Sequence, residues 1–292
     1  MTVQGNEQVP SLMLPAPAKV NLFLHVTGRR ADGYHLLESV FVPVSLTDTV
    51  RLTCRADGQV RLVNAPPDLS ETTELACRAA RALQSVSQCT FGVDIELVKR
   101  IPQGAGLGGG SSDAATTLLG LNRLWRLGKC RDELQALAAT LGADVPFFVF
   151  GQAALARGTG DELQAVTLPA LHLVVASPGV GVATQSVFTH PDLERSTSAL
   201  QRPVFTPRFG RNDLQAVASR LAPEIGQLDH AMKALGLAPR MTGSGSCMFA
   251  LGHNASHADR MRARLIDQKW RAWTVFTLRR HPIYGFANSA RI

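Results

Sequence analysis

The stretch of sequence most able to do chemistry runs from Pro102 to Ala115 and is rich in glycine. Glycine permits positive φ angles and lets a large ligand approach the backbone amides. Ser111, Ser112 and Asp113 predict the cap and first turn of a helix, because apolar residues follow at helical spacing. A loop that leads free N–H groups to a helix N-terminus predicts an anion site, most simply for phosphates. Its five glycines are Gly104, Gly106, Gly108, Gly109 and Gly110.

Three types of glycine-rich loop compete for this stretch. Gly104, Gly106 and Gly109 match the dinucleotide-binding fingerprint, but that fold requires a strand after the helix, whereas residues 131–141 predict a second helix. A Walker A loop requires a lysine after its last glycine, and Ser111 stands there instead. A protein-kinase loop lies between two strands, while this one leads into an alanine-rich helix. A tight turn without a ligand would need only one or two glycines, so we favour a phosphate loop.

A lysine and an aspartate stand in apolar surroundings far from this loop in the sequence. Lys19 and Asn21 lie two residues apart in a predicted strand, so they share one face. An exposed charge at a sheet edge is one interpretation of Lys19, and a cation directed at oxygen ligands is the other. Asp144 stands before the apolar run Phe147 to Phe150, where it would either cap the next turn or accept the proton of an attacking hydroxyl.

Two rings follow a predicted turn near the start of the chain. Asp32 and Gly33 predict the turn, and Tyr34 and His35 come directly after it. An aromatic ring and an imidazole in that position suit either an ordinary surface or a ligand that is stacked and hydrogen-bonded. The sequence alone leaves both interpretations open.

Composition indicates a soluble globular protein. The 292 residues are 45% hydrophobic, enough for one large domain or two ordinary ones. No apolar run approaches the ~20 residues of a membrane span, and the first ten residues do not resemble a secretory signal. Five scattered cysteines without a C-x-x-C pair predict reduced thiols in the cytoplasm. The net charge of +7 suits anionic ligands, and also nucleic acid.

The order of predicted elements indicates an α+β protein of two domains, residues 1–163 and 164–292. In the first domain, residues 42–63 predict a hairpin around Asp57 and Gly58, residues 75–83 a helix, and residues 90–98 the strand before the glycine loop. The second domain alternates strands and helices in an order compatible with a ferredoxin-like layer. Its predicted elements are the strands 171–176, 247–251 and 273–278 and the helices 214–221, 225–235 and 255–267.

The glycine loop resembles the phosphate loop of the GHMP kinases, a family of small-molecule kinases. The shared order is Pro102, a spacer, Gly-Leu-Gly, small residues, Ser-Ser and Ala-Ala. Two blocks, Pro17 to Leu22 and Arg30 to His35, together with Leu141 to Pro146, resemble those members that act on 4-diphosphocytidyl-2-C-methyl-D-erythritol. The resemblance implies a ribosomal-protein-like N-terminal domain and a ferredoxin-like C-terminal domain, with a cleft between them.

The resemblance also implies an activity and its residues. The γ-phosphoryl group of ATP would pass, with Mg²⁺, to the 2-hydroxyl of that substrate in the non-mevalonate route to isoprenoids. Lys19 and Asp144 would be catalytic. The nucleotide would be bound by Lys99, Pro102, Gly104, Gly106, Leu107, Gly108, Gly109, Gly110, Ser111 and Ser112. The substrate would be bound by Asn21, Tyr34, His35, Phe41, Thr184 and Phe188, with Tyr34 and Phe188 on opposite faces of the cytosine ring.

Several points stay open at the level of sequence. Family members usually place an asparagine where this chain has Glu74, which leaves the adenine contact unassigned. No glutamate is matched as a Mg²⁺ ligand, so the choice is between a loop hydroxyl and ATP with water alone. A homoserine or mevalonate kinase of the same family is one alternative, and a basic nucleic-acid-binding protein is another. We expect a small-molecule partner, with neither nucleic acid nor membrane; the oligomeric state is not predicted.

Overall fold

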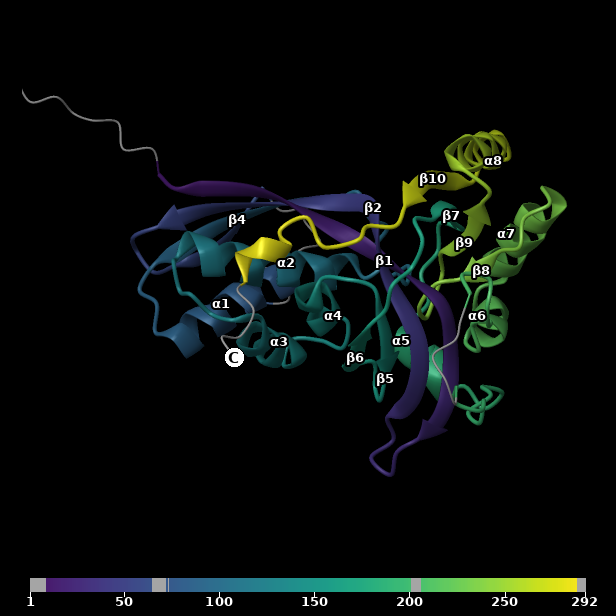
Figure 1. Cartoon of the computed structure of the whole chain (residues 1–292), viewed down its shortest axis with the longest axis horizontal. Helices are drawn as coiled ribbons and strands as arrows, with labels where there is room; N and C mark the ends of the chain where they lie inside the picture. Colours follow the sequence, from purple (N-terminus) through teal and green to yellow (C-terminus); the bar gives the residue numbers. More distant parts are fainter. Residues whose placement is uncertain (1–8, 65–71, 73, 201–205, 288–292) are drawn as a thin grey trace, which may run out of the picture.

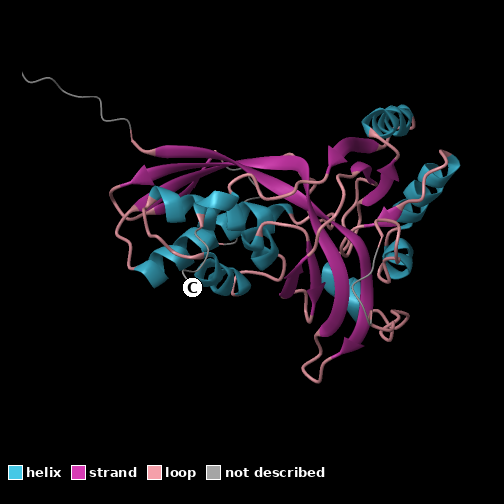
Figure 2. Cartoon of the chain, viewed as in Figure 1, coloured by secondary structure: helices cyan, strands magenta, loops and turns pink. Residues whose placement is uncertain are grey.

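The computed structural model describes residues 9–64, 72, 74–200 and 206–287 and contains two β-sheets with helices packed on them (Figures 1 and 2). The predicted α+β fold is therefore confirmed. A six-stranded sheet belongs to the first half of the chain, and a four-stranded sheet belongs to the second half. Within the described residues, no helix is long and apolar enough to cross a bilayer.

The first sheet is built on a long antiparallel hairpin. Strand β1 (Ser11–Arg29) pairs with β2 (His35–Arg55) from Ser11 opposite Thr53 to Arg29 opposite His35. Bulges between Pro17 and Lys19 and between Asn21 and Leu24 shift the register. Such bulges bend a strand and redirect its side chains, and here they flank the predicted Lys19–Asn21 face.

The remaining strands of this sheet correct one prediction. The sheet order is β3-β4-β2-β5-β6, with β3 (Val60–Val63), β4 (Gly92–Val98), β5 (Ala154–Arg157) and β6 (Glu162–Ala165). The hairpin predicted over residues 42–63 is wrong, because β4 lies between β2 and β3 and pairs with both. The Asp57–Gly58 turn crosses the end of β4, where a side chain on Gly92 would meet Gln59 O at 2.2 Å. A chain that passes this close leaves no room for direct β2–β3 pairing.

Four helices pack against this sheet on one side (Figure 1): α1 (Leu75–Ser87), α2 (Gly109–Leu124), α3 (Arg131–Ala139) and α4 (Val145–Phe150). Helix α2 is central and almost entirely buried. A side chain added at Gly120 would meet Leu14 and Leu52 at 2.5 and 2.6 Å, so α2 lies directly on the strands. This close packing fixes the N-terminus of α2, which follows the glycine loop.

The second sheet has the order β10-β7-β9-β8, and three of its helices, α6, α7 and α8, lie on its outer side (Figure 1). The strands alternate with helices along the chain as in a ferredoxin-like fold. Its strands are β7 (His172–Ser177), β8 (Arg240–Met241), β9 (Met248–Gly252) and β10 (Arg271–Phe276). Its helices are α5 (Thr184–Thr189), α6 (Gln215–Leu221), α7 (Pro223–Ala234) and α8 (Ala255–Asp267).

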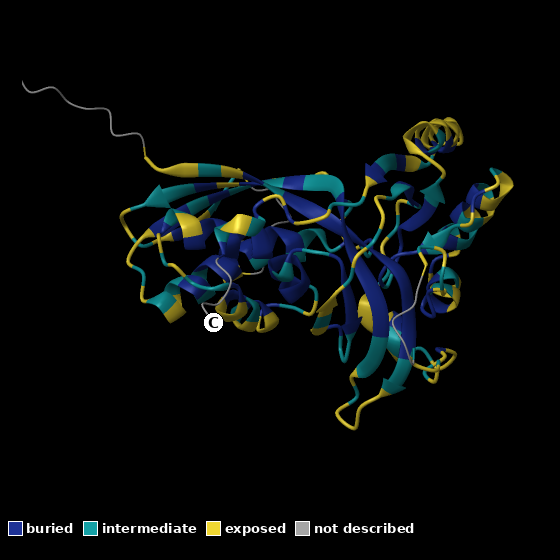
Figure 3. Cartoon of the chain, viewed as in Figure 1, coloured by how far each residue is buried: buried dark blue, intermediate teal, exposed yellow. Residues whose placement is uncertain are grey.

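The two halves share the β1–β2 hairpin. Leu24 and Val26 of β1 belong to the apolar core of the second half, and Figure 3 shows the middle of the hairpin as buried. The chain after β10 also returns to the first half, where His281 N donates to Gly151 O at 2.7 Å. The predicted boundary after residue 163 falls within β6, and the change of sheet comes between β6 and β7. Both halves contact the hairpin. Side chains of β1 and β2 can therefore line a site to which both halves contribute residues.

Candidate active site

Two cavities adjoin each other between the halves of the molecule. The larger, about 690 Å³, is lined by β1, β2 and α5, and the smaller, about 370 Å³, is lined by the glycine loop. Four residues line both cavities: Ser111, Asp144, Thr184 and Ser244. A group that passes from a ligand in one cavity to a ligand in the other would pass these side chains.

The glycine loop has the geometry of an anion cradle. Gly104, Gly106 and Gly108 have φ angles of +60°, +76° and +72°, which side-chain-bearing residues rarely adopt. Gly108 is the N-cap of α2, so the helix begins at Gly109. The amides of the first helical turn precede the first intrahelical hydrogen bond, from Ser112 N to Gly108 O, and can therefore bind an anion.

This helix start corrects the predicted cap at residues 111–113. Ser112 N is already part of the helix, its side chain is fully buried, and Asp113 pairs with Lys99. Of the ten nucleotide residues predicted, eight line the smaller cavity, while Leu107 and Ser112 point into the core. The eight are Lys99, Pro102, Gly104, Gly106, Gly108, Gly109, Gly110 and Ser111.

A second glycine-rich segment lies against the loop. A side chain on Gly106 would meet Thr242 O at 2.0 Å, and one on Gly243 would meet Gly106 O at 2.8 Å. Cys247 N donates to Ala105 O at 3.1 Å. Glycine at position 106 is thus required by contact between two loops as well as by its φ angle.

Lys19 and Asp144 meet at the junction of the cavities. Lys19 Nζ lies 3.4 Å from Asp144 Oδ2 and donates to Asn21 Oδ1 at 2.7 Å. The Lys19 side chain is 4% exposed and lies over the Phe41 ring, whereas Asp144 is 32% exposed. Asp144 is the N-cap of α4, but within the described residues its side chain makes no capping hydrogen bond. Its carboxylate therefore remains available to the cavities.

A chain of hydrogen bonds orients the Lys19 side chain. Asn21 Nδ2 donates to Ser39 Oγ at 2.9 Å, and Ser39 Oγ donates in turn to Phe23 O at 2.5 Å. Asn21 N donates to Thr242 Oγ1 at 3.0 Å. With its amide group fixed in this way, Asn21 presents Oδ1 to the lysine. Asn21 thus links β1, β2 and the second glycine segment.

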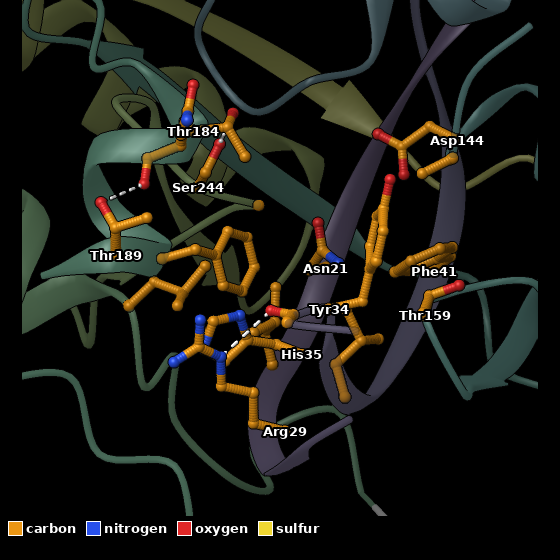
Figure 4. A pocket seen from close by; sticks show the side chains of 18 of the residues that line it. Asn21, Arg29, Tyr34, His35, Phe41, Asp144, Thr159, Thr184, Thr189 and Ser244 are labelled. Atoms are coloured by element: carbon orange, nitrogen blue, oxygen red, sulfur yellow. Dashed lines mark hydrogen bonds between the residues drawn. The ribbon is translucent and has the colours of Figure 1, made fainter. Parts of the chain in front are cut away.

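The predicted substrate residues line the larger cavity. Tyr34, His35 and Phe41 come from the hairpin, and Thr184 and Phe188 come from α5. In Figure 4, Asp144 and Phe41 lie on one side of the cavity, and Thr184 and Ser244 face each other on the other side. The hydroxyls of Thr184 and Ser244 are 2.8 Å apart.

The two predicted stacking rings do not contact each other. Phe188 packs on His35, with ring centroids 5.1 Å apart, while Tyr34 is 66% exposed at the cavity wall. Arg195 Nε donates to His35 Nε2 at 3.1 Å. Burial lowers the pKa of His35, and the charges of Arg195 and Arg29 lower it further. The ring is therefore neutral at pH 7, with the proton on Nδ1.

Comparison with known proteins identifies the family. The model of the GHMP kinases N terminal domain matches residues 74–152, and that of the GHMP kinases C terminal matches residues 196–272. The 4-diphosphocytidyl-2-C-methyl-D-erythritol kinase of Aromatoleum aromaticum is 47% identical over 93% of this chain and 95% of its own length. The chain belongs to the 4-diphosphocytidyl-2-C-methyl-D-erythritol kinase family of the GHMP kinases.

Further comparisons give the same family and the same fold. The same kinase of Thiobacillus denitrificans is 48% identical over 94% of this chain and 99% of its own length. A crystal structure of a 4-(cytidine 5'-diphospho)-2C-methyl-D-erythritol kinase superposes with a TM-score of 0.77 at 40% identity, covering 91% of this chain and 99% of that one. A homoserine kinase of Cytophaga hutchinsonii, at 18% identity and a TM-score of 0.62 over 96% of this chain and 98% of its own, shares the fold.

Several contacts within the site were not predicted from sequence. Ser39 and Thr242 orient Asn21, Asp48 pairs with Lys99, and Arg195 holds His35. Thr242 begins a second glycine-rich run, Thr242 to Ser246, whereas a lone serine, aspartate or arginine carries no local signal. Glu74, the departure from the family pattern, lines the smaller cavity and caps α1 through Ala76 N at 3.4 Å.

Proposed function

We propose that this chain transfers the γ-phosphoryl group of ATP to the 2-hydroxyl of 4-diphosphocytidyl-2-C-methyl-D-erythritol. The observation that carries the proposal is the meeting of Lys19 and Asp144, at 3.4 Å, on the border of two cavities. The family of the chain supports ATP as the donor. The names of its relatives support the acceptor.

ATP would occupy the smaller cavity with its phosphates on the glycine loop. The amides at the start of α2 would bind phosphate oxygens, because a helix N-terminus favours negative charge. Lys19 would face the transferred group from the floor of the junction. The ammonium group of Lys19 is almost fully buried and is therefore well suited to stabilise the charge of a loose transition state.

Asp144 would receive the proton of the acceptor hydroxyl. As that oxygen bonds to the γ-phosphorus, the bond from phosphorus to the bridging oxygen breaks and ADP leaves with its electron pair. The proton of the hydroxyl passes to Asp144, whose carboxylate reaches both cavities. Lys19 and Asn21 would hold that carboxylate and the phosphoryl group in line.

The cytidine part of the acceptor would occupy the larger cavity. Tyr34 and Phe188, both of which line it, are proposed to contact the two faces of the cytosine ring. Base stacking on an aromatic ring contributes ~1–3 kcal/mol without reading the identity of the base. The neutral His35, with one nitrogen held by Arg195, would use Nδ1–H as a donor to the base.

Mg²⁺ fits this site as an ion held mainly by the nucleotide. The described residues contain no group of three or more His, Cys, Asp or Glu side chains that could hold a metal by themselves. Asp144, whose carboxylate lines both cavities, would be the protein group that helps to hold the ion. Mg²⁺ commonly binds through one carboxylate, substrate phosphates and water, and there it would neutralise phosphate charge.

The five free thiols support a reducing compartment, the cytoplasm.

The test is an ATP-consumption assay with three acceptors at equal concentration. We expect turnover with 4-diphosphocytidyl-2-C-methyl-D-erythritol and none above background with homoserine or mevalonate. CDP and CMP should compete with the acceptor, since they would occupy the aromatic part of the larger cavity. Turnover with mevalonate, or indifference to CDP, would reject the proposed substrate.

A further inference from the structure

Three charged side chains, Asp48, Lys99 and Asp113, form a cluster at the base of the glycine loop; we refer to it as the clasp. Lys99 directly follows β4, and its Nζ donates to Asp48 Oδ2 at 2.5 Å and to Asp113 Oδ2. Both carboxylates are 0% exposed, and the Lys99 side chain is 16% exposed. Charges at this depth are stable only when they are paired.

The clasp joins the two ends of the glycine loop. Through Oδ1, Asp48 also accepts hydrogen bonds from Arg100 N at 2.5 Å and Ile101 N at 2.8 Å. One carboxylate of β2 thus fixes the three residues that precede the loop. Asp113 lies in α2, directly beyond the loop. Because a run of glycines has little conformational preference, a connection between its two ends limits the shapes that it can take.

Lys99 is committed to this cluster and is not a free cation in the cavity. Two carboxylates face one ammonium, so the clasp carries a net negative charge unless one carboxylate is protonated. Burial raises the pKa of Asp113 to about 7, Lys99 opposes this rise, and Asp48 and Glu74 add to it. Asp113 Oδ1 is buried without a hydrogen-bond partner among the described residues. A neutral side chain in place of Asp113 would therefore leave a balanced pair of Asp48 and Lys99.

We propose that the clasp positions the glycine loop for ATP, and that Lys99 acts through Asp48 and Asp113 and not as a ligand of the phosphates. The inference rests on the proposed function, since ATP is taken as the occupant of the smaller cavity. Lys99 is then a positioning residue. Loss of Lys99 weakens ATP binding, because two buried carboxylates are then left without a cation. One of them, Asp48, accepts hydrogen bonds from the residues that precede the loop.

A double-mutant cycle separates this role from direct phosphate binding. Adenosine 5'-(β,γ-imido)triphosphate with Mg²⁺ is titrated calorimetrically into Lys99→Met, Asp113→Asn and the double variant, without acceptor. We expect roughly tenfold or more weakening in Lys99→Met, but binding within about threefold of wild type in Asp113→Asn. The double variant should regain affinity to within about threefold of Asp113→Asn, because Asp113 is then neutral and the remaining Asp48 carboxylate keeps its hydrogen bonds from Arg100 N and Ile101 N. A double variant as weak as Lys99→Met would overturn the proposal.

The proposal can still be tested if the Lys99→Met variant does not fold. The comparison of Asp113→Asn with the double variant then decides, and a loss of about tenfold or more between them would assign Lys99 to the phosphates. Asp94→Asn is the matched control, since Asp94 lies on β4, the strand that Lys99 follows, but pairs with Arg55 at 2.9 Å. It should bind the analogue as wild type does.

Steady-state kinetics provide a second readout. Asp48→Ala should raise the KM for ATP roughly tenfold and leave the KM for the acceptor and kcat within about threefold of wild type, because only the loop is displaced. Equal increases of both KM values would indicate general loss of structure and overturn the proposal. Wild-type protein that bound no analogue would contradict the proposed function itself, whereas binding with a failed cycle would contradict the clasp alone.

Discussion

The two cavities are built in different ways. The smaller is lined mainly by one continuous stretch, residues 99–111, and its proposed ligands are backbone amides. The larger is lined by residues from stretches far apart in the chain: the β1–β2 hairpin, Ser111, residues 143–144, Thr159, helix α5, Leu214 and residues 243–244. A phosphate site made of backbone can be encoded locally, whereas a side-chain site exists only once the chain has folded. Substitutions should therefore act differently on the two cavities.

The largest effect is expected where the cavities meet. Lys19→Met and Asp144→Asn should each lower kcat by about 10³, close to 4 kcal/mol, because each removes a charge that faces the reacting oxygens. The KM values for ATP and acceptor should change by less than about tenfold, since neither cavity loses its lining. Asp132→Asn, on the first turn of α3, is the control and should remain near wild type. Near-normal turnover in both catalytic variants would reject the assignment.

The second-largest effect is expected in the glycine loop, at the position that contacts the second glycine-rich segment. Gly106→Ala should raise the KM for ATP by about a hundredfold, near 3 kcal/mol, because the new Cβ meets Thr242 O at 2.0 Å. Gly104→Ala has a similar positive φ angle but no described atom within 4 Å of the new Cβ. It should cost about 1 kcal/mol, the strain of the backbone alone. Equal effects would show that φ, and not contact between the loops, sets the requirement at position 106.

A smaller effect is expected in the aromatic part of the larger cavity. Phe188→Ala should raise the KM for the cytidine substrate about thirtyfold, near 2 kcal/mol, through loss of stacking. The KM for ATP should stay within about twofold, because Phe188 does not line the smaller cavity. Phe91→Ala, at an exposed site before β4, controls for loss of a surface ring. A parallel rise in both KM values would mean that the cavities are not independent.

The smallest expected effect is on the stability of the whole fold and does not depend on either cavity. Burial lowers the pKa of His281 to about 3, with Arg131 lowering it further. Since the unfolded chain binds the proton more readily, the stability provided by neutral His281 is present above pH 6.5 and is lost as the pH falls below that value. The slope is at most about 1.4 kcal/mol per pH unit. Urea unfolding of wild type and His281→Gln between pH 7 and pH 5 measures it, and equal slopes would contradict the assignment.

Local sequence predicted the glycine loop well and its boundaries less well. Five glycines within seven residues, followed by an amphipathic run, were enough to indicate a phosphate loop before a helix. The start of that helix was misplaced, because Ser111 and Ser112 resemble cap residues. Gly108 takes the cap in the structure, and Ser112 is buried against the core. Burial of α2 on the sheet overrides the capping preference of serine.

The pairing of charges could not be predicted from local sequence. Lys99 was expected at the phosphates, since nothing in its neighbourhood indicates that Asp48 lies beneath it. Register brings them together, because Thr49 of β2 pairs with Val98 of β4. Likewise, Arg195 reaches His35 only because α5 and the residues after it fold over the hairpin turn.

The sequence by itself determined features whose signal is local: the glycine-rich loop, several strands and helices of both halves, and the family to which the chain belongs. Tertiary structure alone decided which side chains meet. It brought Lys19 to Asp144, Lys99 to two carboxylates, and Gly106 to Thr242. The physical reason is that backbone conformation depends on near neighbours, whereas contacts between distant residues depend on strand register and on the packing of the two halves around one shared hairpin.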